Sequence, residues 1–440
     1  PAVPAGIVER SRAAIAALHR EMEAVSGDDV FARILADLAE LKAFITDPLS
    51  HQVIMGGMQA AWWLNDHLDE WLGERNVADT LTLSAPHNVT AEMGLALLDV
   101  ADVIRPHAEV VAHLRGVRAH DDAGFLDELG GLDGGPRALD AIDGFVDTYG
   151  MRYVGEIDIT RPRWCERPAT LVPLILGNVE NAEPGQGRRR FRQGQARAQA
   201  KANEVLERLR ALPDGADKAE EAARMIDRVR TFAGYREHPK YVIVSHHLAY
   251  KRALLAEADG LLRDRVIREV EDVHFLTFDE LRAAVRTRQV DLDLVDRRRD
   301  AHRAHEALTP PRVLTSDGEV VMGAYRRDDV PDGALVGLAV SAGTVEGRAR
   351  VIHDIEQADV EPGDILVTGF TDPSWSPLFV AVAGLVTEVG GLMTHGAVVA
   401  REYGLPAVVG VEQATHLIRD GQRIRVHGTH GYVEVLDQQP

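Results

Sequence analysis

The hydrophobic pattern of the chain changes near residue 330, and this change most limits how the chain can fold. Before it, apolar residues recur at intervals of three and four, which is typical of amphipathic helices. After it, short β-branched runs are separated by glycine, which predicts strands joined by tight turns. We therefore predict a multidomain protein, in which a mostly α-helical substrate domain is followed by a compact α/β domain.

The change in pattern sets the predicted domain limits. The helical domain covers residues 1–325, a hinge covers 326–335, and the α/β domain covers 336–440. The hinge sequence RRDDVPDGA combines charge, proline and glycine, a composition that suits a linker better than a core. Within the helical domain, Asp28 and Thr90 precede apolar runs and are predicted N-caps. The stretch VHFLTFDELRAAVR, which starts at Val273, predicts a strand that leads into a capped helix.

Charge and cysteine content argue against several classes of protein. The chain has 49 basic and 69 acidic residues, and its net charge of -20 opposes non-specific binding to nucleic acid or to anionic lipid. A single cysteine excludes an intramolecular disulfide and a multi-cysteine zinc site. The first residues do not resemble a secretory signal, and the longest apolar runs reach about half of a membrane span. We therefore expect a cytoplasmic protein without nucleic-acid or membrane partners.

Histidine pairs occur at His246 with His247 and at His427 with His430. Neither pair has a third carboxylate or cysteine at the spacing of a metal site. We predict that the chain binds no metal.

One histidine follows a paired glycine and precedes an apolar helical pattern, in TEVGGLMTHGAVVAREYGLPAVVGV. Gly390 and Gly391 are predicted to let the backbone turn where side chains would clash, and a helix is predicted to begin near His395. Free N–H groups at a helix start favour a neutral imidazole and an approaching phosphoryl anion. His395 could therefore carry a phosphoryl group covalently, although a structural histidine satisfied by the backbone is the commoner arrangement.

The stretch GGLMTHGAVVAREYGLPAVVG resembles the signature of the swivelling phosphohistidine domain of phosphoenolpyruvate synthase and pyruvate phosphate dikinase. His395 matches the phosphorylated histidine, and Thr394 keeps a hydroxyl where relatives often have serine. The domain order resembles that of the rifampicin phosphotransferase family. The stretches that are similar to this family extend across almost the whole chain and are GEIDITRPRW, DRVRTFAGYREHPKY, LTPPRVLTSDGEV and ILVTGFTDPSW.

This resemblance implies antibiotic inactivation by a dikinase-type mechanism. His395 would be phosphorylated from ATP, the small domain would swing, and a hydroxyl of a rifamycin would receive the phosphoryl group, with AMP and phosphate as the other products. The family binds ATP and Mg2+ in an ATP-grasp domain. The glycine loops of this chain lack a phosphate-binding frame, and no stretch of the chain looks like the ATP-grasp domain. We therefore expect an ATP-grasp partner in cis or in trans, and a helical domain whose first part precedes residue 1.

Two cations flank Pro239 in GYREHPKY, namely Arg236 and Lys240. An arginine can clamp a phosphoryl group with two hydrogen bonds, and a lysine can add a point charge. A solvated helix junction is the simpler interpretation. The resemblance implies instead that both residues assist phosphoryl transfer to the drug hydroxyl.

The segment IMGGMQAAWWLNDHLDEWL supplies Met55, Met58, Trp62 and Trp63. Methionine and tryptophan side chains of this kind can line a large apolar pocket for a macrocyclic drug, and they can equally form a core helix. Two alternative functions also stay open. One is a synthase-like phosphotransferase that acts on another hydroxylated or enol substrate, and the other is a non-catalytic protein that sequesters the drug or carries phosphate.

Overall fold

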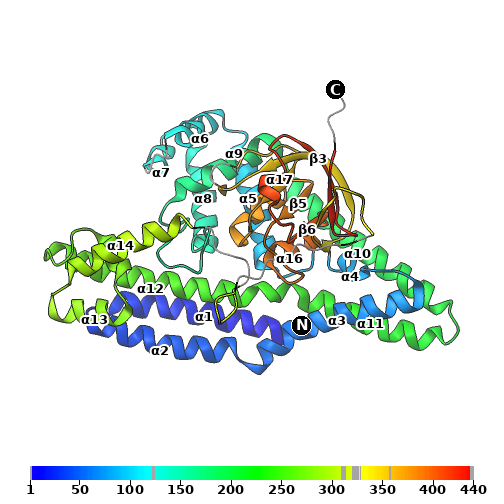
Figure 1. Ribbon diagram of the computed structural model, residues 1–440, viewed down its shortest axis with the longest axis horizontal. Coiled ribbons are helices and arrows are strands. Elements are labelled where there is room, and N and C mark those ends of the chain that lie inside the picture. Colours follow the sequence, from blue (N-terminus) through cyan, green and yellow to red (C-terminus); the bar gives the residue numbers. More distant parts are fainter. Residues whose placement is uncertain are drawn as a thin grey trace. The chain divides into compact units, whose positions relative to one another are not determined.

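The computed structural model describes residues 2–120, 124–308, 314–319, 327, 329–355 and 358–436. The chain is divided by its contacts into two compact units. The first unit contains Pro1–His51, Ile157–Arg161 and Pro239–Gly323, and the second contains Gln52–Glu156, Pro162–His238 and Ala324–Pro440. Helices occupy the first part of the chain and an α/β sheet follows, which confirms the predicted fold class (Figure 1). The predicted domain limits stay a prediction, and hinge residues 326 and 328 lie outside the described ranges.

The first unit is a helical bundle around one apolar core, to which Leu18, Phe31 and Ala253 contribute. Its long helices α1, α2 and α12 run alongside one another in Figure 1. His246 of α12 donates through Nδ1 to buried Asp37 of α2, at 2.7 Å. The helices of this unit are α1 (Ala2–Ala24), α2 (Asp28–Ile45), α12 (His238–Arg263), the 3-10 helix η3 (Val270–Phe275), α13 (Phe278–Thr287) and α14 (Leu292–Glu306).

Two local predictions for this unit are wrong. Asp28 is the first residue of α2 and Gly27 is its N-cap, because the Asp28 carboxylate accepts a hydrogen bond from Arg282 at 2.6 Å instead of capping the helix. The predicted strand at the start of VHFLTFDELRAAVR is helical, since η3 ends at Phe275. The capped helix that was predicted to follow is α13, in which Thr277 accepts a hydrogen bond from the Glu280 N–H.

The second unit contains the remaining helices of the first part of the chain. The first of them, α3, begins in the first unit, whose first segment ends at His51. The N-cap of α5 is Asn88, whose side chain accepts from the N–H groups of Thr90 and Ala91, so the predicted cap at Thr90 is wrong. The helices are α3 (Pro48–Leu72), α4 (Val77–Leu81), α5 (Val89–Ile104), α6 (Ala108–His120), α7 (Phe125–Leu129), α8 (Gly135–Tyr149), η1 (Pro168–Leu171), α9 (Val172–Asn181), α10 (Gln186–Arg210), α11 (Gly215–Phe232) and η2 (Ala233–Glu237).

The α/β part of the second unit is built on one sheet, with the order β1-β8-β7-β3-β4-β5-β6-β2 over the ranges that are described. Strands β3 to β6 are parallel neighbours, and the remaining pairs are antiparallel. The strands are β1 (Leu335–Val336), β2 (Leu338–Ser341), β3 (Thr344–Val351), β4 (Ile365–Thr368), β5 (Gly384–Thr387), β6 (Ala407–Val409), β7 (Arg423–His427) and β8 (Tyr432–Val435).

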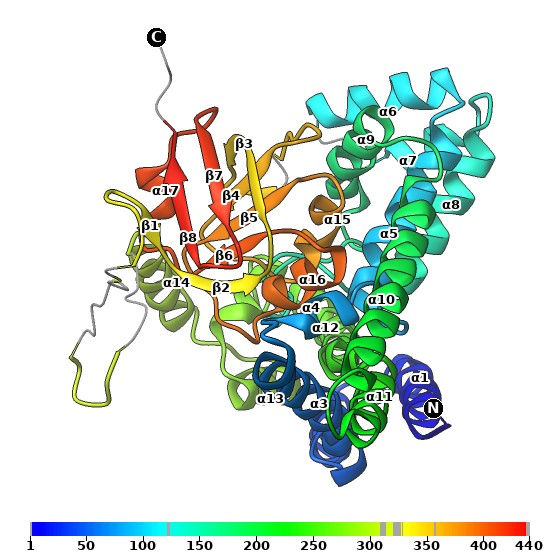
Figure 2. The ribbon, with the colours of Figure 1, turned by 90° about the vertical axis from the view of Figure 1, so that its right-hand side faces the viewer.

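Short helices cover this sheet. They are the 3-10 helix η5 (Pro373–Trp375), α15 (Ser376–Phe379), α16 (His395–Tyr403) and α17 (Ala414–Leu417). In Figure 2, α15 and α16 lie between the sheet and α5, and both contact α5. Strands β4 and β5 are buried along their whole length, as expected for parallel strands that are covered on both faces. Helices α15 and α16 are therefore held against α5.

Candidate active site

His395 is the first residue of α16, as the glycine turn before it predicts. Gly390 is required where it stands, because a Cβ there would lie 2.7 Å from Cβ of Val409. The clash argument is wrong for Gly391, since a Cβ at that position meets nothing within 4 Å. Thr394 donates its hydroxyl to the Gly391 carbonyl at 2.9 Å, which closes the loop just before the histidine. Gly404, with a φ of 64°, ends the helix in the left-handed conformation that favours glycine.

Both ring nitrogens of His395 have partners. Nδ1 lies 2.7 Å from Oε2 of Glu237, and Nε2 lies 3.1 Å from Oγ of Ser376. The histidine side chain is only 9% exposed and that of Glu237 is 7% exposed. The imidazole is thus held between a carboxylate of the helical part and a hydroxyl of the α/β part.

Glu237 ends η2 and determines which ring nitrogen is free to react. Burial alone would raise the pKa of its carboxyl. The charge and the hydrogen bond of His395, together with Arg236 and Arg152, outweigh burial and lower the pKa to about 2. Glu237 is therefore a carboxylate at neutral pH and accepts a hydrogen bond from the N–H at Nδ1. In the neutral form of the imidazole, this contact leaves the lone pair on Nε2, which is then the nucleophilic atom.

Arg236 precedes Glu237 and connects this pair to the loop of His395. Its Nη1 lies 3.4 Å from Oε1 of Glu237, and its Nη2 donates to the carbonyl of Met393. The second predicted cation, Lys240, belongs to α12 and to the first unit. Its part in phosphoryl transfer stays a prediction.

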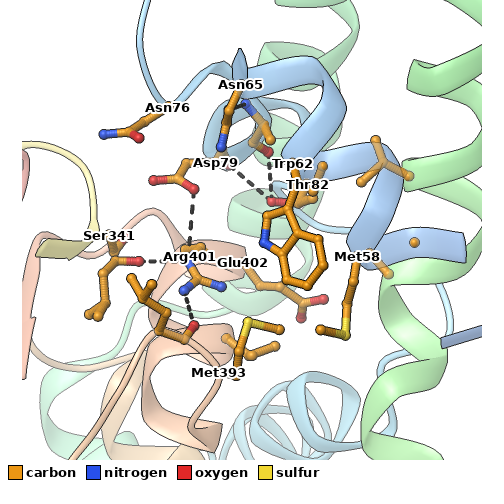
Figure 3. Close-up of a pocket in the computed structure, with 18 of the residues that line it drawn as sticks. Met58, Trp62, Asn65, Asn76, Asp79, Thr82, Ser341, Met393, Arg401 and Glu402 are labelled. Atoms are coloured by element: carbon orange, nitrogen blue, oxygen red, sulfur yellow. Dashed lines mark hydrogen bonds and ion pairs between the residues drawn. The ribbon is translucent and has the colours of Figure 1, made fainter. Parts of the chain in front are cut away.

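A cavity of about 270 Å³ lies beside these residues, with walls from both parts of the second unit (Figure 3). Met58 and Trp62 of α3 line it, as does Arg236. The other two predicted pocket residues are elsewhere. Trp63 stacks on His67 with ring centroids 4.1 Å apart, and Met55 is not among the lining residues. One face of α3 therefore contributes to the cavity, while Trp63 packs against its own helix.

Charged and acidic groups occupy the opposite wall of the cavity. Arg401 donates through Nε to the carbonyl of Val340 at 2.6 Å and lies 3.8 Å from Asp79, and these contacts are visible in Figure 3. Burial raises the pKa of Asp79 to about 6, although Arg401 opposes the shift. Glu402 is 4% exposed, and burial raises the pKa of its carboxyl to about 8, with nearby Glu237 and Glu92 adding to the effect. The cavity thus contains a carboxyl group that is protonated at neutral pH.

The raised pKa of Glu402 leads to a prediction about stability. The folded protein keeps a proton that the unfolded chain releases above the ordinary carboxyl pKa of 4.5. The contribution of Glu402 to the free energy of unfolding is therefore complete below that pH and decreases as the pH rises through about 8. We expect Glu402→Gln to lose less stability than the wild type between about pH 5 and about pH 8, in guanidinium unfolding followed by circular dichroism. Exposed Glu207→Gln is the control, and equal pH dependence of Glu402→Gln and wild type would contradict the assignment.

Several residues of this site could not have been singled out from sequence alone. Glu237 is part of the stretch GYREHPKY, and Ser376 is part of TDPSWSPLF. Nothing in either stretch indicates contact with His395. Glu402 is in register with the phosphohistidine signature, and this was the only sign in the sequence that it belongs to the site.

Over the described residues, no group of three or more His, Cys, Asp or Glu side chains could hold a metal ion. No helix in those same ranges combines the length and the apolar character that crossing a membrane requires.

Comparison with known proteins matches two regions of this chain. Residues 49–237 match the family model described as the rifampicin phosphotransferase fourth domain, and residues 360–431 match the mobile domain of PEP-utilising enzymes. The chain is 67% identical to a rifampicin phosphotransferase of Streptomyces sviceus, over 99% of this chain and 50% of that protein. It is 56% identical to the rifampicin phosphotransferase of Bacillus subtilis, with the same coverage of both chains.

The chain belongs to the rifampicin phosphotransferase family. The resemblance seen in the sequence is thereby confirmed, and the chain spans about half the length of the curated relatives that it matches. The two matched regions divide the site between them. Met58, Trp62, Arg236 and Glu237 lie in the first region, whereas Ser376, His395 and Glu402 lie in the second.

Proposed function

We propose that this chain carries out the phosphoryl-transfer step of antibiotic inactivation in this family. His395 receives a phosphoryl group that originates from ATP and passes it to a hydroxyl of a rifamycin, and the overall products are AMP, phosphate and the phosphorylated drug. The observation that supports this proposal most directly is a continuous chain of contacts. Arg236 lines the cavity and contacts Glu237, which in turn holds His395. The reactive histidine and the cavity thus share one polar connection.

The roles of these residues follow from the hydrogen bonds. Glu237 keeps the proton on Nδ1, so that the imidazole leaves as a neutral group when the bond between Nε2 and phosphorus breaks. A new bond forms between phosphorus and the drug oxygen, and the hydroxyl proton moves to Nε2. Glu237 then pairs with the resulting imidazolium. Arg236 supplies positive charge beside the phosphoryl oxygens during the transfer.

ATP and magnesium are assigned to an ATP-grasp domain, which the family resemblance implies in cis or in trans. The phosphoryl group that this domain delivers is the substrate of the residues described above. We further propose that the chain functions in the cytoplasm and has no nucleic-acid or membrane partner, consistent with its net charge of -20.

A chemically phosphorylated chain tests the function without the ATP-grasp domain. Phosphoramidate can place a phosphoryl group on histidine with release of ammonia, and peptide mapping under alkaline conditions identifies the labelled residue. After removal of the reagent, we expect a rifamycin to accelerate the loss of phosphate from His395 and to gain the mass of one phosphate. Loss of phosphate to water alone would favour a sequestering or phosphocarrier protein. Transfer only to another hydroxylated or enol compound would favour the synthase-like alternative.

The cavity leads to a prediction about drug binding. Met58→Ala and Trp62→Ala each remove apolar surface from the cavity wall, and each should weaken rifamycin binding by about tenfold or more in equilibrium dialysis. Met55→Ala is the matched control, because it removes the same side chain from α3 at a position that does not line the cavity. Unchanged affinity in both cavity variants, or an equal loss in Met55→Ala, would show that the drug binds elsewhere.

A further inference from the structure

Ser376 contacts the atom of His395 that reacts in the proposed function. Its Oγ lies 3.1 Å from Nε2, and the residue is fully buried. Because Nδ1 donates to Glu237, Nε2 offers a lone pair and the serine hydroxyl is the donor. Nothing in the comparisons or in the sequence pattern assigns a role to this serine.

The surrounding backbone holds Ser376 in this position. Asp372 is the N-cap of η5 and accepts a hydrogen bond from the N–H of Ser374, which fixes the turn that leads into α15. Gly396 allows this segment to approach α16, since a Cβ there would overlap the hydroxyl of Thr371. On the opposite side, a Cβ at Gly94 of α5 would lie 3.2 Å from the carbonyl oxygen of Ser376. Three neighbouring elements therefore determine where the serine lies.

Ser376 lies in a different part of the chain from Glu237 and Arg236. Ser376 and His395 both lie within residues 360–431, which match the mobile domain, whereas Glu237 and Arg236 lie within residues 49–237. A mobile domain that travels between two sites takes its own residues along and leaves the others behind. The serine hydroxyl is therefore present at Nε2 wherever the histidine reacts.

We propose that Ser376 is a catalytic residue of both half-reactions, an inference that rests on the proposed function of His395. When a phosphoryl donor reacts, the bond from phosphorus to its leaving group breaks and a bond from Nε2 to phosphorus forms. The serine hydroxyl turns from the Nε2 lone pair to a phosphoryl oxygen and donates its hydrogen bond there, without losing its proton. In the second half-reaction the same hydrogen bond stabilises the phosphoryl group as it moves to the drug oxygen.

Labelling of the full chain with phosphoramidate tests the first half-reaction. Ser376→Ala should label His395 about tenfold more slowly than the wild type, which is the effect expected for one lost hydrogen bond to a charged group. Ser374→Ala is the matched control, because it removes a buried hydroxyl of the same segment that donates to Asp372 and does not contact His395. The nitrogen NMR shift of His395 Nε2 should change in Ser376→Ala and stay unchanged in Ser374→Ala.

Transfer from labelled His395 to a rifamycin tests the second half-reaction, and Ser376→Ala should again be about tenfold slower. Normal rates in both steps, or equal slowing by Ser374→Ala and Ser376→Ala, would overturn the proposal. Should Ser376→Ala fail to fold, the nearly isosteric Ser376→Cys, which is a weaker donor, takes its place under the same criteria. The labelling step requires no drug. A wild-type chain that labels normally and transfers nothing to rifamycin would therefore reject the proposed acceptor, while the labelling rates still decide the role of Ser376.

Discussion

We expect His395→Asn to take up no phosphate at the carrier site when the chain is supplied with an active ATP-grasp domain, ATP and magnesium. The loss should reach at least about three orders of magnitude, because the variant lacks the nucleophile itself. Peptide mapping under alkaline conditions, in which phosphohistidine survives, would measure the labelling. Drug phosphorylation by the same mixture should disappear with it.

The control for this variant is another histidine that is paired with a carboxylate in the α/β part. Nε2 of His427 lies 2.6 Å from Oε2 of Glu434, so His427→Asn breaks a comparable pair that does not include His395. We expect that control to label His395 normally. Full labelling of His395→Asn, or phosphate on His427 in the wild type, would reject His395 as the carrier.

The second large effect is expected for Arg236→Ala, and it should separate the two half-reactions. Arg236 lies in the helical part and contacts Glu237 and the loop of His395, so it acts where the phosphohistidine meets the drug. Losing one well-placed cation removes about 3 kcal/mol of transition-state stabilisation, or about two orders of magnitude in rate. Single-turnover transfer to rifamycin should therefore slow by about a hundredfold, while labelling of His395 by the ATP-grasp partner keeps its normal rate.

Arg230→Ala is the control for loss of a half-buried arginine. Arg230 of α11 donates to the carbonyls of Leu81 and Leu83 and does not contact Glu237 or His395 in the structure. If Arg236→Ala slowed labelling and left transfer intact, the arginine would belong to the other half-reaction. If neither step changed, Arg236 would be a solvated or structural residue of the helix junction.

Local signals in the sequence were sufficient for the immediate surroundings of His395. The glycine turn, the start of α16 at His395 and its end at Gly404 depend on backbone conformations that a few neighbouring residues determine. The partner of Nδ1 could not be predicted in the same way, because Glu237 is 158 positions away along the chain. Contacts at such a separation depend on how whole elements pack, and no local spacing indicates them.

The helix α3 shows the same limit in the cavity wall. Its methionine and tryptophan content identified the helix, but composition does not show which face is turned to the cavity. Met58 and Trp62, at a spacing of four, line the cavity, whereas Trp63 is rotated onto His67. The 3-10 helix η3 was mistaken for a strand for a related reason, since a short apolar run fits either conformation until its packing is known.

Gly94 allows two helices of the α/β part to pack closely against α5. A Cβ at this position would lie 2.7 Å from the hydroxyl of Tyr403 and 3.2 Å from the carbonyl of Ser376, so the bare backbone of α5 is what allows α15 and α16 to come close. A side chain at Gly94 would therefore force α15 and α16 away from α5 and, under the proposed function, would shorten the time that His395 spends at the drug. Under the proposed function, the level of drug resistance then depends on a residue that carries no reactive group, through the residence time of a moving domain.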